Sequence, residues 1–224
     1  MVQRYPLESK MIVTLKGILE NYPPVFDPDR SELPKLLKHL GKPLADDAPL
    51  RLAVVLEANG FNFAVWCLNC VVDHDRDIRS FAVWCGNRAK HLMAEQKSVL
   101  ALESAEKYLA GQITRTSLNR AFDEVRLLVG QLPTLQAEEA ARAAMWVSDW
   151  KTPAWKALLE CSLAAAKSIS WEKAGNEPGW QESQLSFFVE ERARQCAEFK
   201  RLLDETEQST VPPLACTQAM PGSC

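Results

Sequence analysis

Apolar residues recur every three or four positions along most of the chain, which is the spacing of amphipathic helices. A first stripe covers residues 7–22 and stops at Pro23-Pro24. A last stripe begins near Trp180 and consists of Leu185, Phe188, Val189, Arg192, Cys196, Phe199 and Leu203. After Glu207 the periodicity ends. The pattern predicts a helical chain whose final helix carries one long apolar stripe.

Capping residues, prolines and glycines divide the chain into separate helices. Ser31 is expected to cap a short helix that ends at Gly41. Asp46 or Asp47 is expected to cap the next helix, with Pro49 in its first turn. Later boundaries are marked by Gly60, Ser98, Gly111, Thr114, Gly130, Thr152-Pro153 and the break at residues 175–179.

These boundaries predict an all-α fold of about nine or ten helices, arranged as an irregular bundle or as stacked helical hairpins. Residues 50–58 come nearest to a strand pattern, but the flanking caps favour a helix. We expect one domain over residues 1–207, with 1–47 left open as a looser N-terminal extension. Residues 208–224 lack an apolar stripe and are expected to form a disordered tail.

The composition is that of an ordinary globular protein, with 47% apolar and 25% charged residues. A net charge of −3 argues against nucleic acid as the main partner. No apolar run approaches the roughly 20 residues of a membrane span, and no secretory leader is visible. Seven cysteines without a leader suggest free thiols in a reducing compartment. We therefore expect a cytoplasmic protein.

The pentapeptide FAVWC occurs twice, at residues 63–67 and 81–85. The copies are 18 residues apart, which is five helical turns. A polar link at residues 73–76 separates them, and Asp75 or Asp77 is expected to cap the second copy. The two copies are thus predicted to form an antiparallel helical hairpin.

The cysteines of this repeat raise the question of a metal site. Cys67, Cys70 and His74 are spaced i, i+3, i+7, and Cys85 or His91 could supply a fourth zinc ligand. A thiol–imidazole pair from the same residues is a further alternative. Unpaired cysteines are nevertheless among the most buried residues in proteins. We favour core packing of Cys67 and Cys85 and expect no cofactor, while a metal- or thiol-dependent protein stays open.

Residues 114–126 suggest another alternative, a helical nucleic-acid binder. The stretch carries three arginines on one capped helix. Asp123 and Glu124 offset those charges, and the whole chain is acidic. A solvated helix face is therefore favoured over nucleic-acid binding.

Five tryptophans lie between positions 146 and 180, beside alanine-rich helices. Trp146 and Trp150 are four residues apart and share a helix face. Together with Glu138, Glu139 and Asp149, they form the predicted partner-binding surface, an aromatic anchor among carboxylates that suits a basic protein surface. On this hypothesis, Trp150→Ala weakens binding and hardly changes stability. Core packing of the rings is the alternative.

The segment from Leu52 to Thr114 resembles an immunity protein family of bacterial and phage-borne helical proteins. The matching pieces are Asn59-Gly60, Arg79 to His91 and Ala105 to Thr114, and RARQCAEFKRLL at 192–203 resembles the family's last helix. The likeness spans roughly residues 33–205, although the Ala/Trp tract here is short and is broken by Pro153.

The resemblance implies a non-enzymatic role in toxin neutralisation or phage–host conflict. Our interpretation of the sequence is a non-catalytic helical protein that neutralises or modulates a protein partner.

Overall fold

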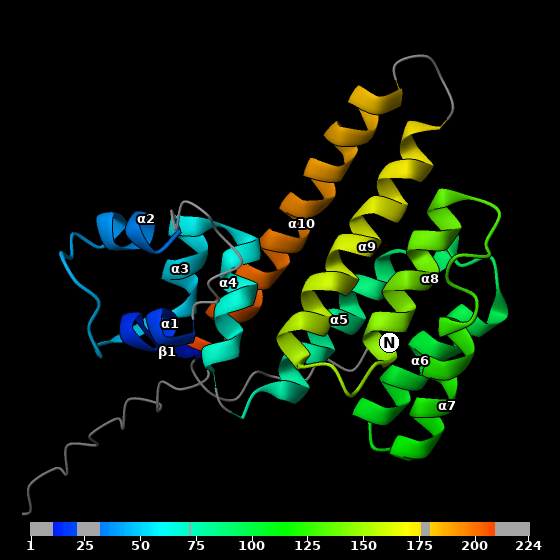
Figure 1. Ribbon diagram of the computed structural model, residues 1–224, viewed down its shortest axis with the longest axis horizontal. Coiled ribbons are helices and arrows are strands. Elements are labelled where there is room, and N and C mark those ends of the chain that lie inside the picture. Colours follow the sequence, from blue (N-terminus) through cyan, green and yellow to red (C-terminus); the bar gives the residue numbers. More distant parts are fainter. Residues whose placement is uncertain (1–10, 22–31, 72, 176–179, 209–224) are drawn as a thin grey trace, which may run out of the picture.

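Helices form most of the described chain, as the apolar spacing predicts (Figure 1). The computed structural model describes residues 11–21, 32–71, 73–175 and 180–208. The elements in these ranges are β1 (Ile12–Thr14), α1 (Leu15–Asn21), α2 (Glu32–His39), β2 (Pro49–Arg51), α3 (Leu52–Asn59), α4 (Phe61–Cys67), η1 (Leu68–Cys70), α5 (Asp75–Arg88), η2 (Lys90–Leu92), α6 (Gln96–Leu109), α7 (Arg115–Arg126), α8 (Leu135–Ser148), α9 (Ala154–Ala174) and α10 (Trp180–Gln208). The predicted all-α class and helix number are confirmed.

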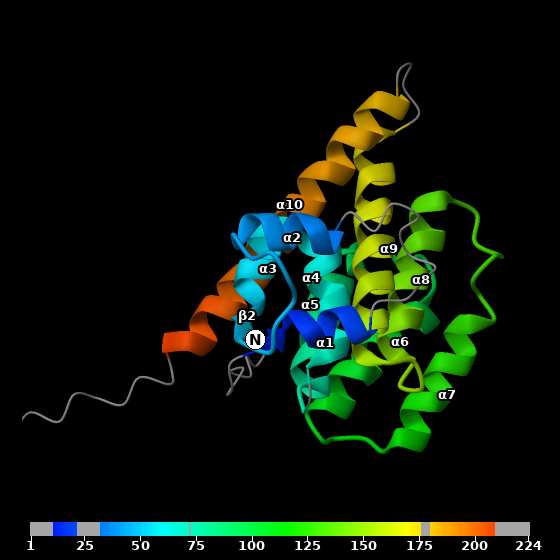
Figure 2. The ribbon, with the colours of Figure 1, turned by 60° about the vertical axis from the view of Figure 1, so that its left-hand side comes forward.

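The helix α9 occupies the centre of the bundle and packs against α5, α8 and α10. Figures 1 and 2 show α8, α9 and α10 side by side, with α6 and α7 at the base. Alanine and serine make up most of the buried residues of α9, and alanine most of those of α8. Such small side chains let helix backbones approach closely, so the alanine-rich tract forms the middle of the core.

The N-terminal part differs from the prediction. Residues 12–14 form a strand instead of continuing a helix, and Pro49 lies in its antiparallel partner instead of a first helical turn. The β-branched run at 12–14 favours extended backbone, and a proline is tolerated at a strand end. Asp46 caps no helix, because its carboxylate accepts from Lys42 Nζ at 2.7 Å and from Ala48 N at 3.2 Å.

This N-terminal part contributes to the same core as the rest of the chain. Leu15 and Ile18 of α1 and Leu36 of α2 are fully buried in one continuous apolar cluster with the central helices. Asn59 at the end of α3 links α2 to the body, since its Nδ2 donates to Glu32 O at 2.7 Å.

The helix boundaries at Gly111 and Thr114 agree with the prediction, whereas the one at Ser98 does not. Thr114 caps α7, its Oγ1 accepting from Ser117 N at 3.3 Å, and Gly111 ends the preceding segment with a φ of 71°. At this positive φ a glycine is far less strained than other residues. Ser98 was expected to cap α6, but the helix begins at Gln96 and Ser98 is buried in its first turn.

The two FAVWC copies do not pair as one hairpin. The helix α4 packs chiefly on α3 and α9, whereas α5 packs on α9, α6 and α8. They meet through Phe61 and Phe81, whose ring centroids are 6.2 Å apart. The helix α5 begins at Asp75 as expected, but neither Asp75 nor Asp77 makes a capping bond, and His74 occupies the cap position. The repeat thus reflects two similar buried stripes rather than one packing unit.

Several predictions concern residues outside the described ranges. They are the Ser31 cap, the loop at 176–179 and the disordered tail at 209–224. Within the ranges that are described, no helix has the length and apolarity needed to cross a membrane.

Gly86 marks the tightest contact of α5 with the core. A Cβ atom at this position would lie 3.0 Å from Leu102 Cδ1, 3.3 Å from Val147 Cγ2 and 3.6 Å from Cys161 Sγ. Three different helices therefore approach α5 at this one residue. A larger side chain can enter only if Leu102, Val147 and Cys161 move aside.

We expect Gly86→Val to lower the free energy of unfolding by about 1–3 kcal/mol through overpacking. Ser80→Val is the matched control, because it places the same side chain on a partly exposed position of the same helix. Urea denaturation of the two variants measures the difference. Equal stabilities would contradict the close packing at Gly86.

Candidate functional site

The five residues of the predicted partner-binding surface are not gathered in one place. Glu138 and Glu139 lie near the start of α8, whereas Trp146, Asp149 and Trp150 lie at or beyond its far end. Glu138 and Asp149 are eleven positions apart, which is ~16 Å along a helix axis. The carboxylates near the start of α8 therefore do not surround the tryptophans.

The two glutamates already have partners within the chain. Glu138 Oε1 accepts from Gly130 N at 2.7 Å and from Arg142 Nη2 at 3.0 Å. Glu139 Oε2 lies 3.8 Å from Arg142 Nε. These contacts hold the α7–α8 connection in place and neutralise part of the charge that was expected to attract a basic partner.

Trp150 is half-buried between two side chains of the bundle. Its ring lies 4.1 Å below Arg79 Cζ, and its centroid is 4.4 Å from that of Tyr108. Trp146 is likewise half-buried against the core. Asp149 organises the α8–α9 turn, since its Oδ2 accepts from Thr152 Oγ1 at 2.7 Å. Packing and turn formation account for these positions, and their role in partner binding stays a prediction.

Arg79 is the buried centre of this end of the bundle, with only 2% of its surface exposed. Its Nη1 donates to Asp149 O at 3.1 Å and its Nη2 to Thr152 O. Burial lowers the pKa of Arg79, against the attraction of Asp75 and Asp149. The guanidinium, stacked on Trp150, therefore fixes the turn between α8 and α9.

The thiols of the FAVWC repeat are buried, as predicted for Cys67 and Cys85. Burial raises the pKa of both thiols and that of the neighbouring Cys161, and it raises the pKa of Cys70 to about 11. A protonated, buried thiol is a poor nucleophile and a poor metal ligand.

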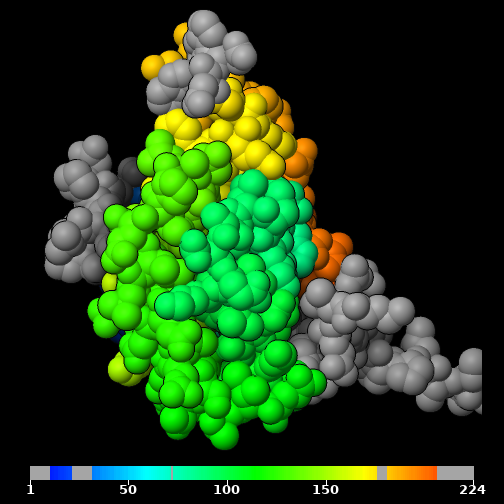
Figure 3. Space-filling view, turned by 90° about the vertical axis from the view of Figure 1, so that its right-hand side faces the viewer, coloured from blue at the N-terminus to red at the C-terminus, as the bar shows by residue number. Residues whose placement is uncertain are grey.

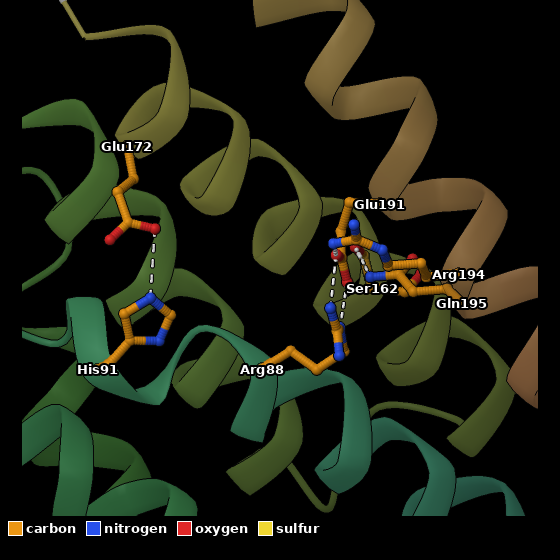
Figure 4. Close-up of polar contacts among 7 residues, drawn as sticks. All are labelled: Arg88, His91, Ser162, Glu172, Glu191, Arg194 and Gln195. Carbon is orange, nitrogen blue, oxygen red and sulfur yellow. Dashed lines mark hydrogen bonds and ion pairs between the residues drawn. The ribbon is translucent and has the colours of Figure 1, made fainter.

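Two of the three histidines contact carboxylates. His74 Nδ1 is 3.2 Å from Asp77 Oδ2, and His91 Nε2 is 3.2 Å from Glu172 Oε2 on α9 (Figure 4). Across the described part of the chain, no three His, Cys, Asp or Glu side chains come together as metal ligands would. The metal alternative therefore has no assembled ligand set among these residues.

The arginine-bearing helix α7 presents charges of both signs to solvent. Arg115, Arg120 and Arg126 are exposed, and so is Asp123, while Leu118 and Val125 face the core. This arrangement matches the solvated face that the sequence favours.

The most unusual group of side chains is a buried polar seam between α10 and the body, which sequence reasoning missed. We define the polar seam as Arg88 of α5, Ser162 of α9 and Glu191, Arg192 and Gln195 of α10. Glu191, Gln195 and Ser162 are fully buried. Charged residues are rarely buried unless they are paired, so the seam needs a specific geometry.

Arg88 and Glu191 form a bidentate ion pair (Figure 4). Arg88 Nη2 donates to Glu191 Oε2 at 2.7 Å, and Arg88 Nε donates to Oε1. Arg194 Nη1 adds a contact of 3.6 Å to the same carboxylate. The bond to Glu191 raises the pKa of Arg88. Two parallel bonds fix the direction of the Glu191 side chain as well as its charge.

Arg192 and Gln195 complete the seam. Arg192 Nη1 donates to Ser162 Oγ at 2.8 Å and to Gln195 Oε1 at 2.7 Å, while Gln195 Nε2 donates to Ser162 O at 3.0 Å. The guanidinium of Arg192 also lies 4.6 Å from the centroid of the Phe61 ring. Burial lowers the pKa of Arg192 to about 10. Arg192 and Gln195 thus tie one turn of α10 to Ser162 of α9.

The opposite side of α10 exposes apolar side chains. Leu185 and Val189 are 61% and 58% exposed, and Ala193, one turn further, is also exposed. We name Leu185, Val189 and Ala193 the outer ridge. Figures 1 and 2 show that the first half of α10 and the end of α9 project beyond the bundle, and in Figure 3 they stand above its green helices. The outer ridge therefore lies on a projecting hairpin.

Comparisons of the chain with protein-family models, curated proteins and solved structures find no match. The resemblance to an immunity protein family therefore rests on the sequence pattern. Two residues that carry it, Asn59 and Arg79, bond to neighbouring elements and serve packing.

Trp150→Ala is expected to lower the free energy of unfolding by about 2 kcal/mol or more, because it removes the ring that supports Arg79 and Tyr108. Chemical denaturation followed by circular dichroism measures the change. Trp171→Ala, near the C-terminal end of α9, provides a comparison for loss of a partly buried indole. An unchanged stability for Trp150→Ala would show that the ring is not needed for packing and is available to bind a partner.

Alkylation of Cys70 should follow a pKa near 11 in the folded protein and near 9 in denaturant. The stability that the protonated Cys70 thiol contributes is present below about pH 9 and is lost as the pH rises through 11. Mass spectrometry of iodoacetamide labelling between pH 7 and 11 measures the profile. A folded-state midpoint near pH 9 would contradict the effect of burial, and one well below pH 9 would show that Cys70 is an activated thiol.

Proposed function

We propose that this chain is a non-catalytic helical binding protein that neutralises or modulates a protein partner, in the manner implied by its resemblance to immunity proteins. The outer ridge carries the proposal. Two aliphatic side chains that the apolar spacing groups with a buried stripe instead face solvent on a projecting hairpin. Apolar side chains presented in this way are typical of a surface that another protein covers.

The charges beside the ridge indicate the chemistry of the partner. Glu182 and Glu190 are exposed on the same solvent-facing side of α10 as Leu185 and Val189. Carboxylates at the rim of an apolar contact favour a partner with basic side chains around an apolar hollow. The proposed partner is still a protein with a basic surface, as the sequence suggests. The proposed contact, however, lies on α10 and not on α8.

Binding of the hairpin would act by occlusion. When a helix lies in a groove of its partner, it makes contact through side chains that are one turn apart. Leu185, Val189 and Ala193 have this spacing. A 29-residue helix covers enough length to block a site on its partner without any chemical step. This mode of action needs neither an activated nucleophile nor a cofactor.

The double variant Leu185→Ser and Val189→Ser should weaken partner binding at least tenfold, because it removes the apolar contacts and leaves the polar seam intact. Leu44→Ser is the matched control, since Leu44 is 76% exposed and lies far from α10 in sequence. Co-purification from native cells identifies the partner, and titration with it gives the affinities. Equal binding by the double variant and wild type would refute the ridge as the contact.

Charge reversal at Glu182 and Glu190 addresses the nature of the partner. It should mainly slow association and reduce the dependence of the association rate on salt. Stopped-flow mixing at several salt concentrations measures both effects. Faster association of the reversed variant would indicate an acidic partner.

A further inference from the structure

The solvent side of α10 changes in shape along the helix. Its first half projects beyond the bundle and exposes the large side chains Leu185 and Val189 (Figure 1). Its second half packs beside α3 and exposes only the small apolar residues Ala193 and Ala197. We name the exposed side chains of α10 between residues 182 and 200 the outer face. The outer face is thus raised in its first half and shallow in its second.

The charges of the outer face are divided in the same way. Its acidic residues, Glu182 and Glu190, lie in the first half, and its basic residues, Arg194 and Lys200, lie in the second. Glu182 and Lys200 are five helical turns apart and therefore lie along one edge of the face. Glu190 and Arg194 are about one turn apart and lie along the other edge. Each edge thus runs from acidic to basic.

Both basic side chains remain open to a second carboxylate. Arg194 Nη1 is 3.6 Å from Glu191 Oε2, yet the side chain is 52% exposed. Lys200 Nζ donates to Glu57 Oε1 of α3 at 2.6 Å and is 47% exposed. A guanidinium has five N–H donors and an ammonium has three, so neither is saturated by these contacts.

A second copy of the chain fits this face when the two α10 helices run antiparallel. A two-fold axis level with residue 191 lays the raised half of each copy on the shallow half of the other. The residues that then lie level with each other across the contact are Val189 with Ala193, Leu185 with Ala197 and Glu182 with Lys200. The same axis brings Glu190 beside Arg194 of the second copy, because a two-fold axis places matching edges together.

A parallel arrangement lacks this match. Each residue would lie level with its own counterpart, so that Glu182 would face Glu182 and Lys200 would face Lys200. Like charges would repel at both ends of the contact. Large side chains would also meet large ones, and alanines would meet alanines. Shape and charge therefore both favour the antiparallel pair.

We propose that the outer face of α10 binds the outer face of a second copy, which gives an antiparallel two-fold dimer. The second copy supplies basic side chains beside a shallow apolar surface, the chemistry that the outer ridge suits. The dimer covers the outer ridge, so a partner must displace the second copy before it binds there. Only this competition rests on the proposed function, because the dimer follows from the outer face alone.

Sedimentation velocity of the full chain tests the dimer without any partner. At roughly 100 µM, where a contact with a micromolar Kd is mostly occupied, the native chain should sediment as a dimer. The double variant Leu185→Ser and Val189→Ser should be monomeric, and the control Leu44→Ser should stay dimeric. A monomeric native chain, or a double variant that dimerises as well as the native chain, would overturn the proposal.

Charge reversal tests the antiparallel arrangement. At low salt, Glu182→Lys and Lys200→Glu should each weaken the dimer at least tenfold, because two like-charge pairs then face each other across the axis. An equal mixture of the two variants should form a heterodimer, since every pair is again of opposite sign. A mixture no more associated than either variant alone would refute this arrangement.

Addition of the partner separates this inference from the proposed function. A partner that converts the dimer into a complex with one copy of the chain would support both. A complex that still contains the intact dimer would refute the outer ridge as the partner contact and leave the dimer standing. A native chain that is monomeric, but loses partner binding in the double variant, would refute the dimer alone.

Discussion

Close packing around the small side chains of α9 is the constraint on which the rest of the structure depends. Alanine and serine line this helix on the sides that meet α5, α8 and α10. A helix that packs against other helices on several sides has little room on those sides for large side chains of its own. The larger side chains must therefore come from the surrounding helices, as Leu102 and Val147 do around Gly86.

The same constraint explains why polar groups reach the interface with α10. An Ala/Ser surface offers few deep grooves for large aliphatic side chains, but serine hydroxyls and carbonyls offer hydrogen bonds. Ser162 and Ser170 each donate to a carbonyl of their own helix and accept from α10, from Arg192 and Gln184 respectively. The middle of α10 therefore meets α9 through long polar side chains, whereas Leu185 and Val189 nearer its start are exposed to solvent.

Local sequence signals predict the helices and several of their ends, because caps and positive-φ glycines act within a few residues. Thr114 and Gly111 are examples. The strand at 12–14 was missed because its pairing with 49–51 joins distant segments. The polar seam was missed for the same reason, since Arg88 and Glu191 are 103 residues apart. Only one weak signal was present: Glu191 and Gln195 are four residues apart, and so share a helix face.

The tryptophans show how little composition says about which surface binds a partner. Their clustering beside alanine-rich helices is compatible with rim packing or with a binding site, and composition cannot separate the two. The structure gives Trp150 a cation and an aromatic edge as neighbours within its own chain. Leu185 and Val189 have an ordinary sequence context, yet they are the side chains left in solvent. Their exposure follows from their place on the part of α10 that projects beyond the bundle (Figure 1). A search for binding residues in such bundles should therefore begin with the parts of helices that extend past their neighbours.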